Sequence, residues 1–280
     1  MAGSLSLTSW RTLAAATALA ALAGCASAPP ADITLAPGAS PAASGGASPP
    51  ANGRAVQVGN LRTERIEWKG VKPECSGECP TIEIDSVSFP DIPQLSKLVD
   101  RVLASLTGVD ENLRGQYQSL SEYVQYFWRN AQGRDATYFK AQVRDVQAGV
   151  IAVELHTVQN FTGAAHGIPA TVFLNWQLSS NAVLPLEAVL IAGRKAEFDA
   201  LLKAAHQRWL ATNEDAQRDR AAYDRMWPFQ PSENFALTEK GLVIKYDAYS
   251  IAPYSHGEPE LLIPYDQLRG VLKPEFLPRA

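Results

Sequence analysis

The sequence is poor in the residues from which metal and redox sites are built, with three cysteines, four histidines and two methionines among 280 residues. The histidines are isolated, and neither an HxxxH nor an HExxH pattern occurs, so a zinc site would have to be assembled by the fold. No CxxC pair and no GxSxG nucleophile turn occurs either. We therefore expect no metal, no cofactor and no catalytic residues.

Clustered positive charge and long apolar segments are also missing. The formal net charge is −4, and no group of lysines and arginines forms the basic patch that nucleic-acid binding requires. After Cys25 no apolar stretch is long enough to cross a bilayer as a helix. Nucleic acid is therefore not an expected partner, and any membrane attachment must come from the N-terminus.

The N-terminus carries the pattern of a bacterial secretory signal. Arg11 precedes an apolar run over 13–23 that is built almost wholly of alanine and leucine and is too short to span a bilayer. The run ends in Leu-Ala-Gly-Cys at 22–25, which resembles a lipobox. We therefore expect residues 1–24 to be a signal peptide and Cys25 to be the lipidated, palmitate-bearing first residue. The alternative is an ordinary signal with an incidental cysteine.

Residues 25–60 are expected to be a disordered tether. From residue 26 to residue 53 the chain is nearly all alanine, proline, glycine and serine, and Asp32 is its only charge before Arg54. Such a segment buries too little apolar surface to offset the entropy of ordering it. Because Ala26 rather than aspartate follows Cys25, the resemblance to other lipoproteins favours the periplasmic face of the outer membrane.

The two remaining cysteines are expected to form a disulfide. Cys75 and Cys79 are separated by three residues, a spacing that matches neither a redox nor a zinc pair. An exported chain meets an oxidising compartment, where two cysteines this close pair with each other. The bond would fix a turn before the strand that starts near Thr81.

Hydrophobic periodicity predicts an α+β domain over 61–280, with antiparallel sheets packed against helices and an order of roughly β-αα-βββ-α-βββ-α for the main elements. Two sub-lobes, 61–190 and 191–280, would meet near a long helix that starts at Arg194. The expected strands are 61–68, 81–85, 138–143, 150–158, 171–178, 182–185, 235–237, 242–246 and 261–263. The other expected helices are 95–106, 113–127, a solvated helical stretch over 213–225 and a terminal helix over 264–272.

The segment 235–272 is the least generic part of the chain. Its markers are Gly-Leu-Val-Ile at 241–244, Tyr-Ser-Ile-Ala-Pro-Tyr at 249–254, Gly257, Ile-Pro-Tyr at 263–265 and Leu268. With Gly-Ala-Ala-His-Gly at 163–167 and Leu186 to Leu190, they resemble the domain family that the RsiV anti-sigma factor shares with the N-terminal region of the PdaC peptidoglycan deacetylase. The resemblance spans 66–272.

That resemblance implies an extracytoplasmic α/β module whose best-understood relative binds lysozyme and signals envelope damage. The present sequence departs from both named relatives. If the signal is cleaved, we expect none of the cytoplasmic segment that binds a sigma factor, and we expect no counterpart of the metal-dependent deacetylase domain. We therefore expect the binding-type module alone, held on a lipid.

The resemblance and the residue chemistry single out four candidate ligand-binding residues, His166, Tyr249, Tyr254 and His256. The tyrosines suit carbohydrate stacking or a protein hot spot, although packing or turn formation is the more common role. For His166 there are two alternatives. It is a ligand or a base, or its side chain forms a hydrogen bond that fixes the glycine-rich turn. We favour the second. His256 lies near Glu258 and Glu260 in the sequence, and such a pair could do general acid–base work if a nucleophile faced it.

Two functions follow from these observations. The first is a noncatalytic envelope lipoprotein that binds a protein or a peptidoglycan-related ligand, such as an attacking lysozyme. The second is a hydrolase of cell-wall polymer that uses His166 or His256 with a nearby carboxylate. We prefer the first, because no catalytic constellation is visible in the sequence.

Overall fold

A computed structural model describes residues 55–58, 61–107 and 117–278. The predicted signal peptide, Cys25 and most of the predicted tether lie outside these residues. Within the described ranges, none of the helices combines the length and the apolar character needed to cross a membrane.

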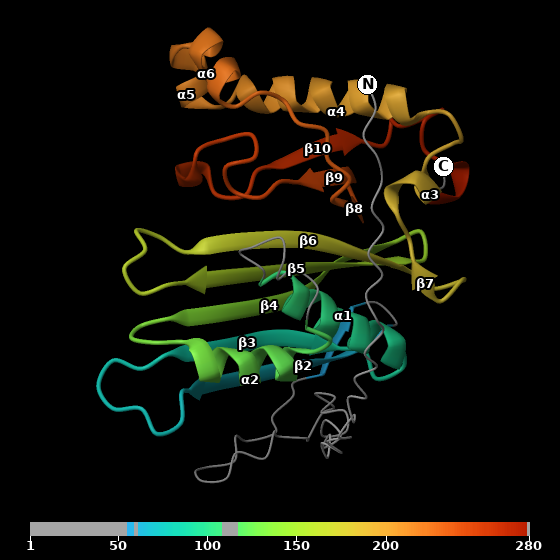
Figure 1. Ribbon diagram of the computed structural model, residues 1–280. Coiled ribbons are helices and arrows are strands. Elements are labelled where there is room, and N and C mark those ends of the chain that lie inside the picture. The colour runs from blue at the N-terminus through green and yellow to red at the C-terminus, as the bar shows by residue number, and fades with distance from the viewer. Residues whose placement is uncertain (1–54, 59–60, 108–116, 279–280) are drawn as a thin grey trace, which may run out of the picture. The chain divides into compact units, whose positions relative to one another are not determined.

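The larger of two sheets has seven strands in sequence order (Figure 1). They are β1 (Ala55–Val58), β2 (Leu61–Val71), β3 (Thr81–Ser88), β4 (Ala136–Gln147), β5 (Val150–Asn160), β6 (Ile168–Gln177) and β7 (Ala182–Val183). Neighbouring strands are antiparallel except β3 and β4, which run parallel. A parallel pair needs a crossover connection. Helices α1 (Pro93–Ser105) and α2 (Leu120–Asn130) supply it.

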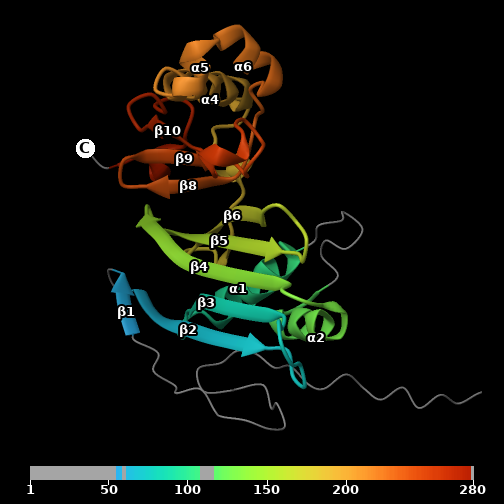
Figure 2. The same ribbon diagram turned by 90° about the vertical axis from the view of Figure 1, so that its left-hand side faces the viewer.

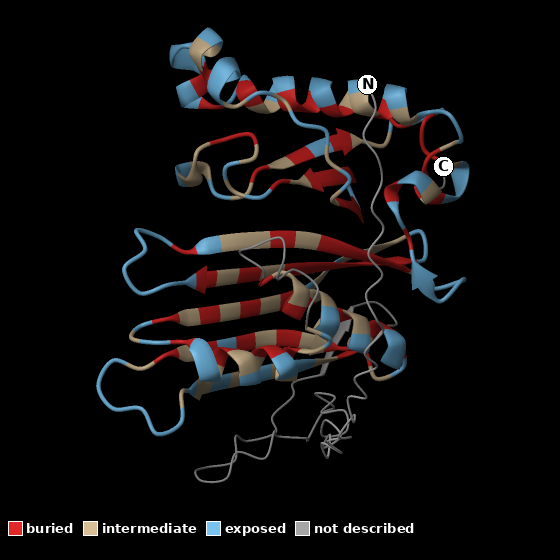
Figure 3. Cartoon of the chain, in the orientation of Figure 1, coloured by how far each residue is buried: buried red, intermediate tan, exposed pale blue. Residues whose placement is uncertain are grey.

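One face of this sheet is covered by α1 and α2 (Figures 1 and 2). Leu95, Val99 and Leu103 of α1 belong to the same buried apolar cluster as Ile151 and Leu155 of β5. Alternation along the strands therefore sorts apolar side chains toward the helices, and Figure 3 shows the resulting stripes of buried and less buried residues.

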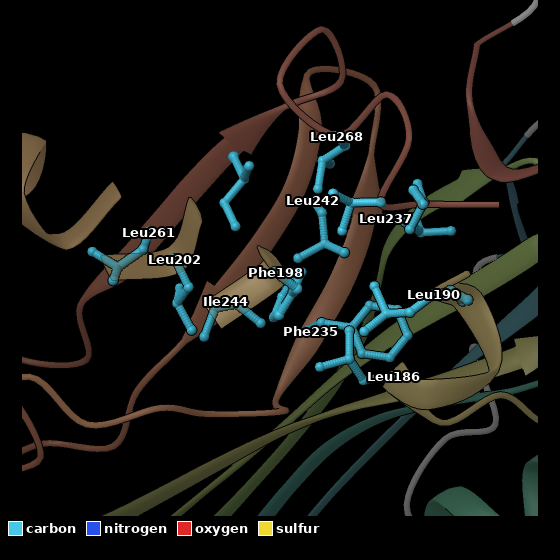
Figure 4. Close-up of a cluster of buried hydrophobic side chains, with 14 of the residues drawn as sticks. Leu186, Leu190, Phe198, Leu202, Phe235, Leu237, Leu242, Ile244, Leu261 and Leu268 are labelled. Carbon is cyan, nitrogen blue, oxygen red and sulfur yellow. The ribbon is translucent and has the colours of Figure 1, made fainter. Parts of the chain in front are cut away.

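The second sheet has three antiparallel strands in the order β10-β9-β8. The elements after the large sheet are α3 (Leu186–Val189), α4 (Lys195–Leu210), α5 (Glu214–Arg218), α6 (Arg220–Met226), β8 (Phe235–Thr238), β9 (Gly241–Lys245), a 3₁₀ turn η1 (Tyr254–His256), β10 (Glu260–Pro264) and a 3₁₀ turn η2 (Pro274–Phe276). Figure 4 shows how Phe198 and Leu202 of α4 lie against leucine and isoleucine side chains of the three strands. This forms a second apolar core.

The two sheets belong to one compact unit. A small cluster of Ala152, Phe173, Ala236 and Val243 lies between them, so β8 and β9 pack on the face of the large sheet that the helices leave open. Gly241 permits the tight pairing of β9 with β10, because an added Cβ there would lie 2.3 Å from the carbonyl oxygen of Ile263.

The structure confirms the α+β class and differs from the expected elements in several places. The large sheet is mixed rather than purely antiparallel, and β1 lies inside the range assigned to the tether. The helix expected over 264–272 is replaced by turns, and η2 follows. The backbone of residues 271–273 instead pairs with the end of α3 and the residues after it. Ile191 N–H donates to Val271 O at 2.9 Å, and Lys273 N–H donates to Val189 O at 2.9 Å.

The cysteine pair agrees with the predicted disulfide, because the Sγ atoms of Cys75 and Cys79 lie at bonding distance, 2.09 Å. The loop joins β2 to β3. The second expected helix begins only at Leu120, where Ser119 caps it.

Replacing Ser119 with alanine is expected to lower the free energy of unfolding by about 1 kcal/mol. The Ser119 side chain accepts the backbone N–H of Glu122 at 3.2 Å, which satisfies a donor that the helix itself leaves unpaired. Urea unfolding followed by circular dichroism measures the change. Ser121→Ala, one residue inside α2, is the control and should change stability by less than about 0.5 kcal/mol.

Candidate functional site

Three of the four candidate residues meet in a cluster of aromatic rings. His166, from the β5–β6 turn, stacks on Tyr254 with ring centroids 4.2 Å apart, and Tyr249 lies 5.6 Å from Tyr254. Trp227, at the end of α6, extends the cluster by stacking on Tyr249 at 6.2 Å. The elements that carry these rings all reach the same end of the molecule (Figure 1). We call these four residues the ring cluster.

Two hydrogen bonds hold the ring of His166. The carbonyl oxygen of Gly167 can only accept, so Nδ1 donates to it at 2.9 Å. Nε2 lies 2.9 Å from the hydroxyl of Tyr249, which can donate to it or accept from it. His166 thus bonds to the neighbouring Gly167 within its turn and links that turn to Tyr249, 83 positions away in the sequence.

Tyr249 has two features that packing alone does not explain. Its backbone φ is +68°, a conformation that costs free energy for a residue with a side chain, and 49% of its surface is exposed. Strained backbone conformations concentrate at binding and catalytic sites. Tyr249 therefore lies in a turn and not in the core, which is one of the two common roles expected for it, and Tyr254 is half-buried.

His256 lies in η1 and faces a different set of neighbours. Its Nε2 is 3.7 Å from Oδ2 of Asp215, and its Nδ1 is 3.4 Å from Oγ of Ser255. Trp209 of α4 approaches its ring edge-on at 6.3 Å. His256 thus has a carboxylate and a hydroxyl nearby, but the carboxylate comes from α5 and not from Glu258 or Glu260.

A cleft of about 440 Å³ opens beside Tyr249. Its walls come from β6, from the loop before β8 and from the loop after β9, and they include Gln230, Ser232, Asp247 and Ser250. These side chains offer hydroxyl, amide and carboxylate groups next to the ring of Tyr249.

A second group of polar residues lies between the two sheets, where β9 crosses β5. The ammonium of Lys245 contacts Oε1 of Glu154 and lies 3.1 Å from Oε2 of Glu258, whose Oε1 is 3.0 Å from Nδ1 of His156. The side chains of Lys245, Glu154 and Glu258 are only 11%, 8% and 12% exposed. At the edge of this group, Nη2 of Arg144 donates to Oε2 of Glu260 at 2.8 Å. We call Lys245, Glu154, Glu258 and His156 the ion network.

Electrostatics in the ion network favour the charged forms. Burial alone would raise the pKa of Glu154, but the hydrogen bonds from Lys245 and Gln142 lower it below its ordinary value. Burial likewise opposes ionisation of Glu258, whose pKa is lowered overall by His156 and Lys245. The pKa of Lys245 is raised despite burial, because Glu154 and Glu258 stabilise its charge.

Stability should therefore fall as the pH drops below about 4.5, the ordinary pKa of glutamate. A carboxyl group with a lowered folded pKa contributes stability that is present above its unfolded pKa and is lost as the pH falls through the folded pKa. Urea unfolding between pH 3 and pH 7 measures this dependence. In Glu258→Gln the free energy of unfolding should depend less steeply on pH over the same range. In the exposed control Glu67→Gln this dependence should keep the wild-type slope. Equal slopes in both variants would show that Glu258 does not cause the pH dependence.

Sequence reasoning missed Trp227, Asp215 and Lys245. One signal was available, because Glu154 and His156 alternate onto the same polar face of β5. Nothing local to β9 marks Lys245 as their partner. Among the described residues no group of three or more histidines, cysteines, aspartates or glutamates is arranged to hold a metal ion.

These observations define a two-sheet α+β domain with a partly exposed ring cluster at one end. The chain belongs to the DUF3298 family, described as a protein of unknown function, whose pattern matches residues 188–266. Membership follows from a crystal structure of a DUF3298 family protein from Pseudomonas aeruginosa PAO1. It is 37% identical, with a TM-score of 0.72 over 79% of this chain and 99% of that one.

A DUF3298 protein from Bacteroides fragilis NCTC 9343 shares the fold, with 20% identity and a TM-score of 0.58 over 78% of this chain and 95% of that one. No functionally curated protein gives a significant match. The matched range 188–266 includes Trp227, Tyr249, Tyr254 and His256 but not His166.

Proposed function

We propose that this protein is a noncatalytic lipoprotein of the bacterial cell envelope that binds a protein or a peptidoglycan-related ligand, such as lysozyme. Cys25 would carry the lipid, and the tether would hold the domain at the periplasmic face of the outer membrane. The observation that carries the proposal is the ring cluster, in which a strained and exposed Tyr249 is held in place by His166. The sequence resemblance to the lysozyme-binding module of RsiV supports the choice of ligands.

The ring cluster has the composition of a binding hot spot. Tyrosine and tryptophan supply large contact areas with few rotatable bonds, so little conformational entropy is lost when they bind. Hydrogen bonding to His166 restrains Tyr249 further before any ligand arrives.

Co-sedimentation with purified peptidoglycan and capture on immobilised lysozyme test the proposal. The purified full-length protein should bind at least one of them, and Tyr249→Gly combined with Tyr254→Ala should weaken that binding at least about tenfold. Glycine suits a positive φ, so the first substitution does not strain the fold. Tyr126→Ala, on α2, is the matched control. Binding to neither ligand would contradict the proposal.

The lipid attachment has its own test. Cells that express the protein with labelled palmitate should yield a labelled membrane-bound form, and Cys25→Ser should abolish the label. Label retained in Cys25→Ser would refute the assignment.

The second candidate function is hydrolysis of a cell-wall polymer, favoured by the contacts of His256 with Asp215 and Ser255. A histidine between a carboxylate and a hydroxyl has the composition of a nucleophile–base pair. If this function operates, the protein should release soluble fragments from peptidoglycan, and His256→Ala should stop the release. No release by the wild-type protein would exclude it.

A further inference from the structure

We propose that the cleft beside Tyr249 binds an uncharged sugar, one that carries hydroxyl or N-acetyl groups and no acidic group. This deepens the proposed function and rests on it, because Tyr249 belongs both to the ring cluster and to the wall of the cleft. The volume of about 440 Å³ falls within the range of roughly 300–1,000 Å³ that small-molecule sites occupy.

The chemistry of the walls matches a sugar ring. A pyranose presents polarised C–H groups on its faces and hydroxyl groups around its edge. The face of an aromatic ring is the negative part of its quadrupole, so it attracts the C–H face. Gln230, Ser232 and Ser250 line the same cleft as Tyr249 and offer both donors and acceptors for hydroxyl groups.

The charges of the cleft select against acidic ligands. Lys245 is the only cationic residue among those that line it, and its ammonium is held by Glu154 and Glu258 on the side of the ion network. Asp247 is exposed and lines the cleft as a carboxylate. A uronate or a phosphate would therefore meet negative charge without an available cationic partner in the cleft.

The cleft is already formed before any ligand binds. Asn234 joins its walls, because its Oδ1 accepts the Phe173 N–H at 2.6 Å while its Nδ2 donates to the carbonyl oxygen of Lys245 at 3.1 Å. Asp247 Oδ1 accepts the N–H of Thr171 at 2.7 Å. Sites that are fixed in advance lose less entropy on binding.

Titration with an oligomer of N-acetylglucosamine, followed by calorimetry and by saturation-transfer NMR, tests the proposal on the full-length protein. The wild type should bind the oligomer. Tyr249→Gly should weaken binding at least about tenfold, and Gln230→Ala should weaken it about threefold to tenfold. An oligogalacturonate of equal length should not bind measurably.

Met226→Ala is the control for substitutions inside the cleft. Met226 is 66% exposed and adjoins Trp227 in sequence, but it does not line the cleft. Its truncation should leave oligomer binding unchanged. If the wild type binds lysozyme or peptidoglycan but not the oligomer, the sugar assignment is wrong and the proposed function stands. If it binds none of the three, both are wrong. Binding of the oligogalacturonate would overturn the selection against acidic sugars.

Discussion

Replacing Lys245 with methionine is expected to lower the free energy of unfolding by about 3–5 kcal/mol. Methionine keeps much of the side chain's length but removes the charge that both Glu154 and Glu258 contact. Two carboxylates would then remain almost fully buried, Glu154 with Arg144 at 3.7 Å and Glu258 with the ring of His156 at 3.0 Å as their remaining basic neighbours. Removing one member of a buried ion group costs this much because the remaining charge has lost water and gains no partner.

Chemical denaturation at pH 7 measures the loss. Arg62→Met is the control, because its ion pair with Asp91 is 55% and 65% exposed and should be worth less than about 1 kcal/mol. Adding Glu154→Gln and Glu258→Gln to Lys245→Met should recover part of the lost stability. A Lys245→Met protein as stable as Arg62→Met would show that the ion network does not hold the sheets together.

Replacing Phe198 with alanine is expected to lower the free energy of unfolding by about 3–5 kcal/mol, the second large effect. Phe198 is fully buried in the core that α4 forms with the three-stranded sheet (Figure 4). Its removal loses apolar burial and leaves a cavity that the surrounding strands only partly fill. Val183→Ala, at a position 48% exposed on β7, should change stability by less than about 1 kcal/mol.

Calorimetry of Phe198→Ala also tests whether the two sheets unfold together. The apolar cluster around Phe173 and Val243 and the ion network both join them, so a single transition should shift to lower temperature. Two separated transitions, with only one of them shifted, would instead show that the sub-lobes fold independently.

Local pattern predicted the elements that are stabilised locally. The apolar stripe that contains Phe198 and Leu202 predicted α4, and the turn around Gly149 predicted the β4–β5 hairpin. The parallel pairing of β3 with β4 escaped prediction, because it depends on a crossover through two helices and not on alternation within either strand.

The candidate site was predicted only in part, because several of its contacts join residues that are far apart in the sequence. The resemblance singled out His166, Tyr249 and Tyr254, and the fold brings them together. Trp227 follows the stretch 213–225, whose pattern indicates only a solvated helix, so its place beside Tyr249 became visible only in three dimensions. Lys245 and Glu154 are 91 positions apart, and each alone resembles an ordinary charged residue on a strand.

The side chains of Asn234 and Asp247 have a further consequence for the solution behaviour of the protein. Beyond the two-residue β7, the outer edge of β6 would present unpaired backbone groups, the kind of edge onto which a strand of another molecule can add. Asp247 accepts the N–H of Thr171, and Asn234 accepts that of Phe173 and donates to the carbonyl oxygen of Thr171 at 3.3 Å. Side chains thus occupy the places where a foreign strand would bond, which protects the edge from aggregation.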